Sequence, residues 1–481
     1  MPQTQQTKTR TVPGSIPYLG HAVGFAAWPL KFLSQQRALG DITAISLGPN
    51  QARIVNDPAL VRELLVSRTK DFIKAGPLYD ISSAFVGNGL AISEGTFHRR
   101  QRRLMQPAFQ RSRMPAYHSG MQQAAETMAG RWRSGQPVDI HKNLFQLAVQ
   151  VIGTMLYGDR FTDEMTDRIV WAVSTASKGI GWRSVIPLSW AHTLPTPEYR
   201  RFSDAQQALH RLGDLVVAEH RKLQDADPDH FLSMLLAARD EHGEPLSDIE
   251  LRDEVVTLFS AGSATVATTL AWALHLLSTH QDVEERLHAE VVEVLDGRPV
   301  TAADLPRLEY LGRVITEVLR LYPPAWLLPR ITPEDTELGG HRIPRGTHVF
   351  FSPYSIHHDP RFYPDPERFD PDRWLPEPST GRPREVYLPF GAGIHQCIGN
   401  NFALTEATIA LATIAAGWRL CRPPRAKVGT RSAALLEPVG LTLIARRRPA
   451  PVRRQASSQA PATGQDGCPH AGAGARPADA S

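Results

Sequence analysis

Residues 390–399 read FGAGIHQCIG, a glycine-rich loop that ends in Cys397 just before a long, mostly apolar run. We expect that run to be a helix, so that Cys397 stands at a helix N-terminus. Free N–H groups and the positive end of the helix dipole favour thiolate there, and thiolate is the form of cysteine that binds metal ions. Gly393 and Gly399 would let the backbone pass close to a flat ligand. A lone cysteine in a loop is more often an inert buried side chain, so this loop by itself leaves two interpretations open.

The pattern as a whole resembles the heme-binding signature of the cytochrome P-450 family. The positions that match are Phe390, Gly393, the basic residue His395, Cys397 and Gly399. The resemblance covers about residues 12–446 and implies a mainly α fold with small β-sheets, built around a buried heme b whose iron is bound by Cys397. A thiolate ligand pushes electron density that favours O–O cleavage. The resemblance therefore implies a heme-thiolate monooxygenase.

Two further motifs follow the order expected of that family. Glu317-Val-Leu-Arg320 resembles its E-x-x-R motif, and positions i and i+3 share a helix face, so the two side chains can pair. Residues 366–369, PERF, resemble the motif that comes next, and Arg368 would complete a buried Glu-Arg-Arg cluster. We expect this cluster to be structural and to hold the loop that carries Cys397.

The two propionates of heme need cationic or hydrogen-bonding partners. The resemblance implies four of them. Arg102 and His98 stand in HRRQR, where the family usually has W-x-x-x-R, so His98 replaces the usual tryptophan. Arg330 follows the Pro-rich turn LYPPAWLLPR, and His395 lies two residues before the cysteine. A solvated surface position is the competing interpretation for each.

Residues 261–265, AGSAT, resemble the family motif A-G-x-[D/E]-T, which implies that Thr265 hydrogen-bonds dioxygen and its water. Ala264 stands where the motif has an acid. Proton supply is thus left open among ordered water, the substrate and the more distant acids Asp253 and Glu254. A peroxide-driven or isomerising heme-thiolate enzyme is the alternative suggested by Ala264, and a non-enzymatic heme sensor is a third.

The resemblance also implies a substrate pocket. Four of the residues that line it would be Phe85, Ala264, Trp326 and Leu327. The other residues expected around this pocket are overwhelmingly apolar. A carboxylate substrate would need an arginine that is not evident there, so we expect a compact, neutral, hydrophobic substrate. Residues 74–109 resemble bacterial enzymes of the pentalenene oxygenase type, which oxidise cyclic sesquiterpenes. A fatty-acid or polyketide hydroxylase is the alternative.

The chain has no complete G-x-G-x-x-G and no P-loop, so we expect electrons to come from a separate protein. Residues 98–113 contain six arginines and no acid. The resemblance implies that this region docks an acidic ferredoxin or flavodoxin, which is served by an NAD(P)H reductase. Nothing in the segment resembles a nucleic-acid-binding motif, and electrostatic steering of an acidic redox partner accounts for it better.

Composition predicts a cytoplasmic protein. Three cysteines in 481 residues cannot form a disulfide framework, which favours a reducing compartment. The uncharged stretch 255–277 is long enough to span a bilayer. It contains six Ser or Thr residues and Gly262, and its flanks show no excess of Lys or Arg on one side, so we expect a buried central helix and no membrane span.

The organisation of the chain is predicted as a loose arm (1–12), one large domain (13–447) and a disordered Pro-, Ala- and Gly-rich tail (448–481). Residues 41–55 predict two short strands around a Gly-Pro-Asn turn. The central helix is predicted to begin at Ser247, which forms a capping box with Glu250, and to run to about residue 278.

Overall fold

The computed structural model describes residues 9–185, 196–222 and 230–449. Helices make up most of the fold, and the strands form small sheets, which confirms the predicted fold class. The helices are α1 Ala22–Ala27, α2 Pro29–Gln36, α3 Pro58–Arg62, α4 Pro77–Val86, α5 Gly95–Met105, α6 Met114–Gly130, α7 Ile140–Tyr157, α8 Asp163–Val185, α9 Pro197–Arg221, α10 Phe231–Ala237, α11 Asp248–Thr257, α12 Ser263–Thr279, α13 Gln281–Leu295, α14 Glu309–Leu321, α15 Pro353–His357, α16 Pro376–Ser379 and α17 Asn400–Gly417.

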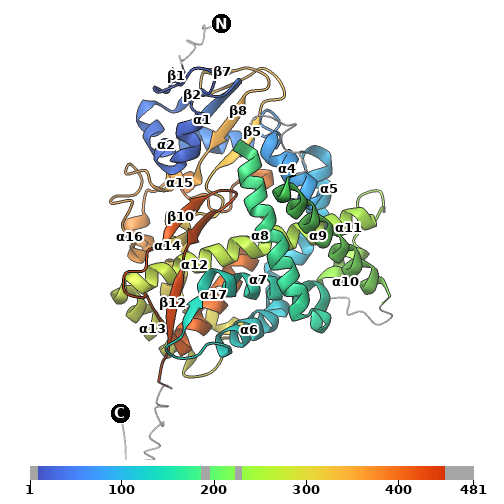
Figure 1. Ribbon diagram of the computed structural model, residues 1–481, viewed down its shortest axis with the longest axis vertical. Helices are drawn as coiled ribbons and strands as arrows, with labels where there is room; N and C mark the ends of the chain where they lie inside the picture. The colour runs from blue at the N-terminus through green and yellow to red at the C-terminus, as the bar shows by residue number, and fades with distance from the viewer. Residues whose placement is uncertain (1–8, 186–195, 223–229, 450–481) are drawn as a thin grey trace, which may run out of the picture.

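The strands form a larger sheet in the order β1-β2-β3-β8-β5 and three smaller sheets, β4-β12-β9, β6-β7 and β10-β11. In Figure 1 the larger sheet lies at the top with the N-terminus, and α12 crosses the middle of the helical part below it. The bounds are β1 Arg10–Thr11, β2 Ile42–Leu47, β3 Asn50–Val55, β4 Pro137–Asp139, β5 Leu328–Ile331, β6 Thr336–Leu338, β7 His341–Ile343, β8 His348–Phe351, β9 Trp418–Cys421, β10 Gly429–Ser432, β11 Leu436–Val439 and β12 Thr442–Arg447.

The two strands expected within residues 41–55 are β2 and β3, which pair antiparallel with Ile42 opposite Val55. The predicted loose arm is wrong at its inner end. β1 pairs in parallel with β2, and Val12 is buried in the core beside the sheet. Residues 1–8 of that arm and residues 450–481 of the predicted tail lie outside the described residues, as does Cys468.

The central helix begins as predicted. Ser247 and Glu250 form the capping box, with Ser247 N–H donating to Glu250 Oε2 at 2.7 Å and Glu250 N–H donating to Ser247 Oγ at 3.3 Å. The helix continues through α11, a π-helical turn at Leu258–Gly262 and α12. Length and composition would let Asp248–Thr279 cross a membrane, but 78% of its most apolar window is buried inside the protein. It is the buried central helix that the sequence predicts.

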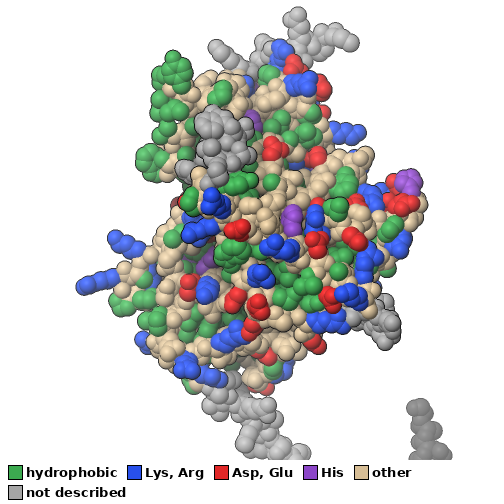
Figure 2. Space-filling model, turned by 45° about the vertical axis from the view of Figure 1, so that its right-hand side comes forward, with side chains coloured by type: hydrophobic (Ala, Val, Ile, Leu, Met, Phe, Trp, Pro, Cys, Tyr) green, Lys and Arg blue, Asp and Glu red, His purple; other side chains and the backbone are tan. Residues whose placement is uncertain are grey.

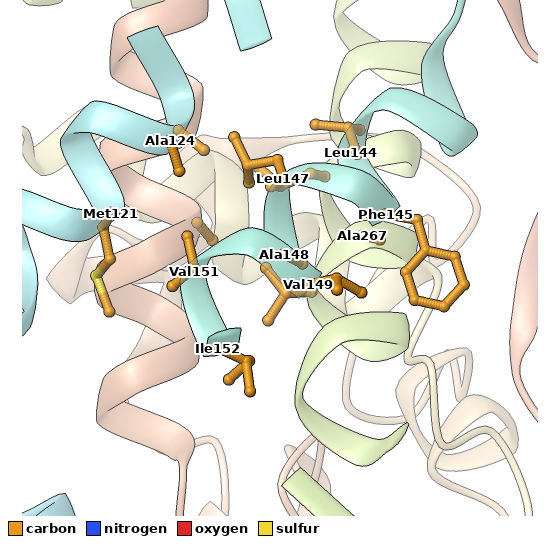
Figure 3. Packing of buried hydrophobic residues seen from close by; sticks show 14 of the residues in the cluster. Met121, Ala124, Leu144, Phe145, Leu147, Ala148, Val149, Val151, Ile152 and Ala267 are labelled. Carbon is orange, nitrogen blue, oxygen red and sulfur yellow. The ribbon is translucent and has the colours of Figure 1, made fainter. Parts of the chain in front are cut away.

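Helix α7 lies between α6 and the central helix (Figure 3). Leu147 and Val151 of α7 point toward α6, and Ala148 lies on the side of the central helix. Burying a leucine or valine side chain contributes about 1.5–3 kcal/mol. Close packing also requires glycine at position 153, because a Cβ there would collide with the ring of Phe161. This packing fixes the central helix against the rest of the fold.

On the face shown in Figure 2, acidic and basic side chains are interspersed over the lower part of the molecule, without a large area of one sign. Hydrophobic side chains gather at the upper left of that view. The net charge of +4 is therefore not concentrated on this face.

Candidate active site

The loop that carries Cys397 is a tight backbone turn closed by a bond from Cys397 N–H to Phe390 O at 2.9 Å. Gly391 and Gly393 have φ values of 67° and 70°, which strongly favour glycine. A Cβ at Gly393 would also collide with the carbonyl of Leu65. Glycine at position 393 therefore permits a close approach to a neighbouring segment of the protein, and its close approach to a flat ligand stays a prediction.

Gly399 differs from Gly393, because a Cβ there would meet only Phe109 at an ordinary 3.8 Å. Its φ of −89° is open to any residue, so space and backbone do not demand glycine. Helix α17 starts immediately after Gly399, as predicted for the residues that follow the cysteine.

Cys397 lies on the wall of a cavity of about 380 Å³ that it shares with the central helix. Burial raises the pKa of its thiol, against the opposing effects of a hydrogen bond from Gly399 and the charge of Arg102. The thiolate therefore needs further positive charge in the cavity, as a bound metal ion provides. Within the described part of the chain, no group of three His, Cys, Asp or Glu side chains could hold a metal. A single thiolate suits a metal whose other ligands belong to a cofactor.

Four basic side chains predicted to bind propionates come together on the wall of this cavity: His98, Arg102, Arg330 and His395. Arg330 is only 4% exposed and donates to the hydroxyl of Tyr79 at 2.8 Å. It forms no ion pair with any carboxylate among the described residues. A buried cation without an acidic partner is costly, so this position suits an anionic ligand group.

Lys74 is a fifth basic residue of the cavity that sequence reasoning missed. Its ammonium group donates to the carbonyl of Ala91 at 3.1 Å. Burial lowers the pKa of Lys74 to about 7, although the charge of Glu94 opposes this. The sequence feature that could have revealed Lys74 is its position as the one charged residue of the stretch 72–79, just before the helix that starts at Pro77.

The rings of His98 and His395 lie in contact in a tilted arrangement, with 4.5 Å between their centroids and 59° between their planes. Burial lowers the pKa of His98 to about 3, so this residue offers a neutral ring. Its Nδ1 is buried without a hydrogen-bond partner in the described structure. His395 Nε2 lies 3.0 Å from Glu94 Oε1. Burial alone would raise the pKa of Glu94, but hydrogen bonds from His395, Lys74 and Gly95 lower it to about 2.

These features fit heme. The cavity is lined by apolar side chains, a thiol stands on one wall, and two buried or half-buried arginines, two histidines and a lysine are available to carboxylates. The other polar residues on the lining are Tyr79, Glu254, Thr257, Thr265, Thr269 and Gln396.

Glu317 is the centre of the buried cluster predicted to hold the cysteine loop. Arg320 donates to both of its carboxylate oxygens at 2.8 Å, and neither side chain is exposed. The second arginine is Arg373, whose Nε lies 3.3 Å from Glu317 Oε1, and Trp374 donates to Oε2 at 2.8 Å.

The prediction for Arg368 is therefore wrong. Its side chain is 70% exposed and lies 4.0 Å from Asp370. Only the backbone carbonyl of Arg368 reaches the cluster, where it accepts a hydrogen bond from Arg320 at 3.1 Å. The pattern P-x-R-aromatic occurs twice in succession, at residues 366–369 and 371–374, and the second copy provides the buried arginine.

Thr265 lines the cavity and donates to the carbonyl of Ala261 at 2.7 Å. Ala264 is 5% exposed and does not line it, because adjacent residues of a helix point about 100° apart. The π-helical turn just before Thr265 loosens the helix where the cavity touches it.

The other predicted substrate-pocket residues also point into the protein core. Phe85 packs against Phe202, with 5.5 Å between ring centroids, and Trp326 donates to the carbonyl of Ala433 at 2.9 Å. Leu327 packs with the cluster beside β2 and β3. The cavity wall is built instead from their neighbours, among them Leu90, Ile152, Leu258, Ala325 and Leu328.

Comparisons with known proteins agree with this site. The family model described as Cytochrome P450 matches residues 11–432. Pentalenene oxygenase from Streptomyces avermitilis is 41% identical over 87% of this chain and 92% of its own. Cyclooctat-9-en-7-ol 5-monooxygenase from Streptomyces melanosporofaciens is 42% identical over 87% of this chain and 91% of its own. A crystal structure of the cytochrome P450DA heme domain superimposes with a TM-score of 0.83 at 26% identity, covering 92% of this chain and 99% of that one.

Proposed function

This chain belongs to the cytochrome P450 family and is a heme-thiolate monooxygenase, and we propose that its substrate is a compact, neutral terpenoid. The cofactor is heme b. When bound, heme activates dioxygen so that one oxygen atom enters the substrate and the other leaves as water. The remaining chemistry is that of the side chains around it.

We assign Cys397 as the iron ligand, since of the two cysteines that the structure describes it alone lies on the cavity wall. Arg102, Arg330, His395 and Lys74 provide positive charge or hydrogen bonds for the propionates, and His98 provides a neutral ring nitrogen. Charge-assisted hydrogen bonds to carboxylates are the stronger kind, so these residues set the orientation of the ring.

Our assignment of the basic residues on the cavity wall supports a neutral substrate. Each basic residue of the lining is assigned to a propionate, and none of the described lining residues remains to bind a substrate carboxylate. The rest of the wall is dominated by apolar groups such as Leu90, Leu258 and Leu328. A fatty acid would leave its carboxylate unpaired, which is costly. Two relatives named for terpenoid oxidation support the same choice.

We propose that electrons come from an acidic ferredoxin or flavodoxin that docks beside α5. Arg102 donates to the carbonyl of Gln396 at 2.6 Å, so α5 lies directly against the cysteine loop. Arg100 and Arg103 are neutralised by Asp240, Glu250 and Glu241. The exposed Arg99 and Arg111 form no ion pair among the described residues and remain free to steer a partner. Such a pairing fits a cytoplasmic enzyme.

The test is a substrate screen with the heme-loaded protein. Pentalenene, a cyclic diterpene alcohol and a long-chain fatty acid would each be supplied with a ferredoxin, its reductase and NADPH, or with hydrogen peroxide alone. We expect oxidised product from a terpenoid with the electron-transfer proteins, and a substrate-induced change in the heme absorbance. Oxidation of the fatty acid alone would refute the terpenoid assignment. Turnover by peroxide alone would favour the peroxide-driven alternative.

A further inference from the structure

Glu254 is a fully buried carboxyl group on the wall of the same cavity as Cys397 and Thr265. Its Oε2 accepts a hydrogen bond from Leu90 N–H at 3.1 Å. Its Oε1 is buried and has no partner in the described structure. An ionised carboxylate with an unpaired oxygen is strongly disfavoured in such a place. The group must therefore be neutral or hold a water molecule in the cavity.

Glu254 belongs to a row of polar groups along one side of the central helix. Glu254, Thr257, Ala261 and Thr265 all line the cavity. At 1.5 Å per residue the row spans about 16 Å from end to end. Thr257 Oγ1 is also buried without a partner, and Thr265 Oγ1 donates to the carbonyl of Ala261. A buried water needs two to four polar partners, and these groups can supply them.

The neighbouring acid, Asp253, has a different role although it is equally buried. Its Oδ1 accepts from Arg252 at 2.8 Å, and its Oδ2 accepts from Asn88 N–H at 2.8 Å. Asp253 does not line the cavity. Asp253 is paired with Arg252 and holds residues 87–89 against the central helix. The sequence left Asp253 and Glu254 open as distant proton sources. Of these two acids, only Glu254 lines the cavity that contains Thr265.

We propose that Glu254 supplies protons to Thr265 and so replaces the acid that is missing at Ala264. This rests on the monooxygenase function. Each turnover that puts one oxygen atom into a C–H bond and releases the other as water consumes two electrons and two protons. The electrons come from the redox partner. Each proton leaves the O–H bond of Glu254 for a water held at Thr257, and a proton of the water chain passes to the hydroxyl of Thr265. Thr265 in turn gives up its own hydroxyl proton to the oxygen atom that leaves as water.

Glu254 must regain a proton after each transfer, and we infer that this proton comes from Lys74. The Lys74 ammonium contacts the carbonyl of Leu90, whose N–H donates to Glu254. Lys74 lines the same cavity, and burial lowers its pKa to about 7, which lets it exchange a proton near neutral pH. The Glu254 carboxylate regains its proton from Lys74 through water, and Lys74 regains one from solvent.

The charges that face Glu254 favour its neutral form at pH 7. Burial raises the pKa of Glu254 to about 8, against the hydrogen bond from Leu90. Asp253 and Glu250 on its own helix raise the pKa further, and Lys74 opposes them. Glu254 is thus protonated at neutral pH and loses its proton as the pH rises through about 8.

The decisive variant is Glu254→Gln, because glutamine keeps an acceptor for Leu90 N–H and loses the proton. The matched control is Asp253→Asn, which keeps an acceptor for Asn88 N–H. We expect Glu254→Gln to lower the rate of product formation roughly 10- to 100-fold, at or below the lower end of what a placed general acid contributes. Electrons should go to hydrogen peroxide instead. Glu254→Asp should recover part of the loss, and Asp253→Asn should leave product per electron unchanged.

Two readouts separate proton supply from a structural role. Product per electron should fall above about pH 8 in the unmodified protein and stay flat in Glu254→Gln. The infrared spectrum of the resting heme-loaded protein at pH 7 should contain a protonated-carboxyl band that Glu254→Gln removes. Equal coupling and equal pH profiles in the two proteins would overturn the inference, and so would absence of that band. The infrared result tests the protonation of Glu254 even if no terpenoid is oxidised. A failure to oxidise terpenoids while the band is present would refute the proposed substrate and leave the inference about Glu254 standing.

Discussion

Replacing Arg373 by alanine tests which arginine completes the cluster around Glu317, and Arg368→Ala is its matched control. Arg373→Ala removes a contact of 3.3 Å to the Glu317 carboxylate. It also removes donors at 2.7 Å and 3.2 Å from the carbonyls of Pro364 and Asp365. Arg368→Ala removes only an exposed side chain.

The expected magnitudes differ widely. Removing one partner of a buried ion pair costs about 3–5 kcal/mol. Glu317 keeps Arg320 and Trp374 as partners, so we expect the lower end, about 3 kcal/mol. That corresponds to a more than 100-fold change in the unfolding equilibrium, since about 1.4 kcal/mol is tenfold. For Arg368→Ala we expect a change within about 0.5 kcal/mol, as for other exposed positions.

The assay is urea unfolding of the two heme-loaded variants, followed by tryptophan fluorescence and by the heme absorbance. Bound heme stabilises the folded state of both variants, so the difference between them reports the cluster. Because the cluster supports the cysteine loop, Arg373→Ala should also release heme at a lower urea concentration. A larger loss of stability in Arg368→Ala than in Arg373→Ala would refute our assignment.

Further predictions concern the cofactor and the redox partner. Cys397→Ser should abolish the long-wavelength ferrous–CO band, whereas Cys421→Ser on β9 should keep it; the opposite result would remove Cys397 as the iron ligand. Arg330→Ala should raise the rate of heme loss to apomyoglobin at least about tenfold, because a charge-assisted hydrogen bond contributes about 1.5–3 kcal/mol, and an unchanged rate would contradict its role. Reduction should slow as salt rises, and charge reversal at Arg99 and Arg111 should slow it at low salt without loss of heme; a salt-independent rate would exclude this docking face.

Much of the site follows from short patterns whose physics is local. Residues 390–399 specify the cysteine turn, since the positive φ at Gly391 and Gly393 and the following helix are properties of neighbouring residues. The start of the central helix at Ser247 is equally local, because a capping box joins residues three apart. Pairing of Glu317 with Arg320 belongs to the same class, as the two lie one turn apart on a helix.

Only the tertiary structure decided which side chains face the cavity. Two successive P-x-R-aromatic patterns were indistinguishable in sequence, and packing against Glu317 selected Arg373. Likewise Ala264 was expected to line the pocket, whereas the helix turns it into the core. Lys74 and Glu254 reach the cavity because segments far apart in the chain meet at Leu90. A sequence pattern specifies the period of an element, but the direction in which a side chain points depends on what the rest of the fold packs against it.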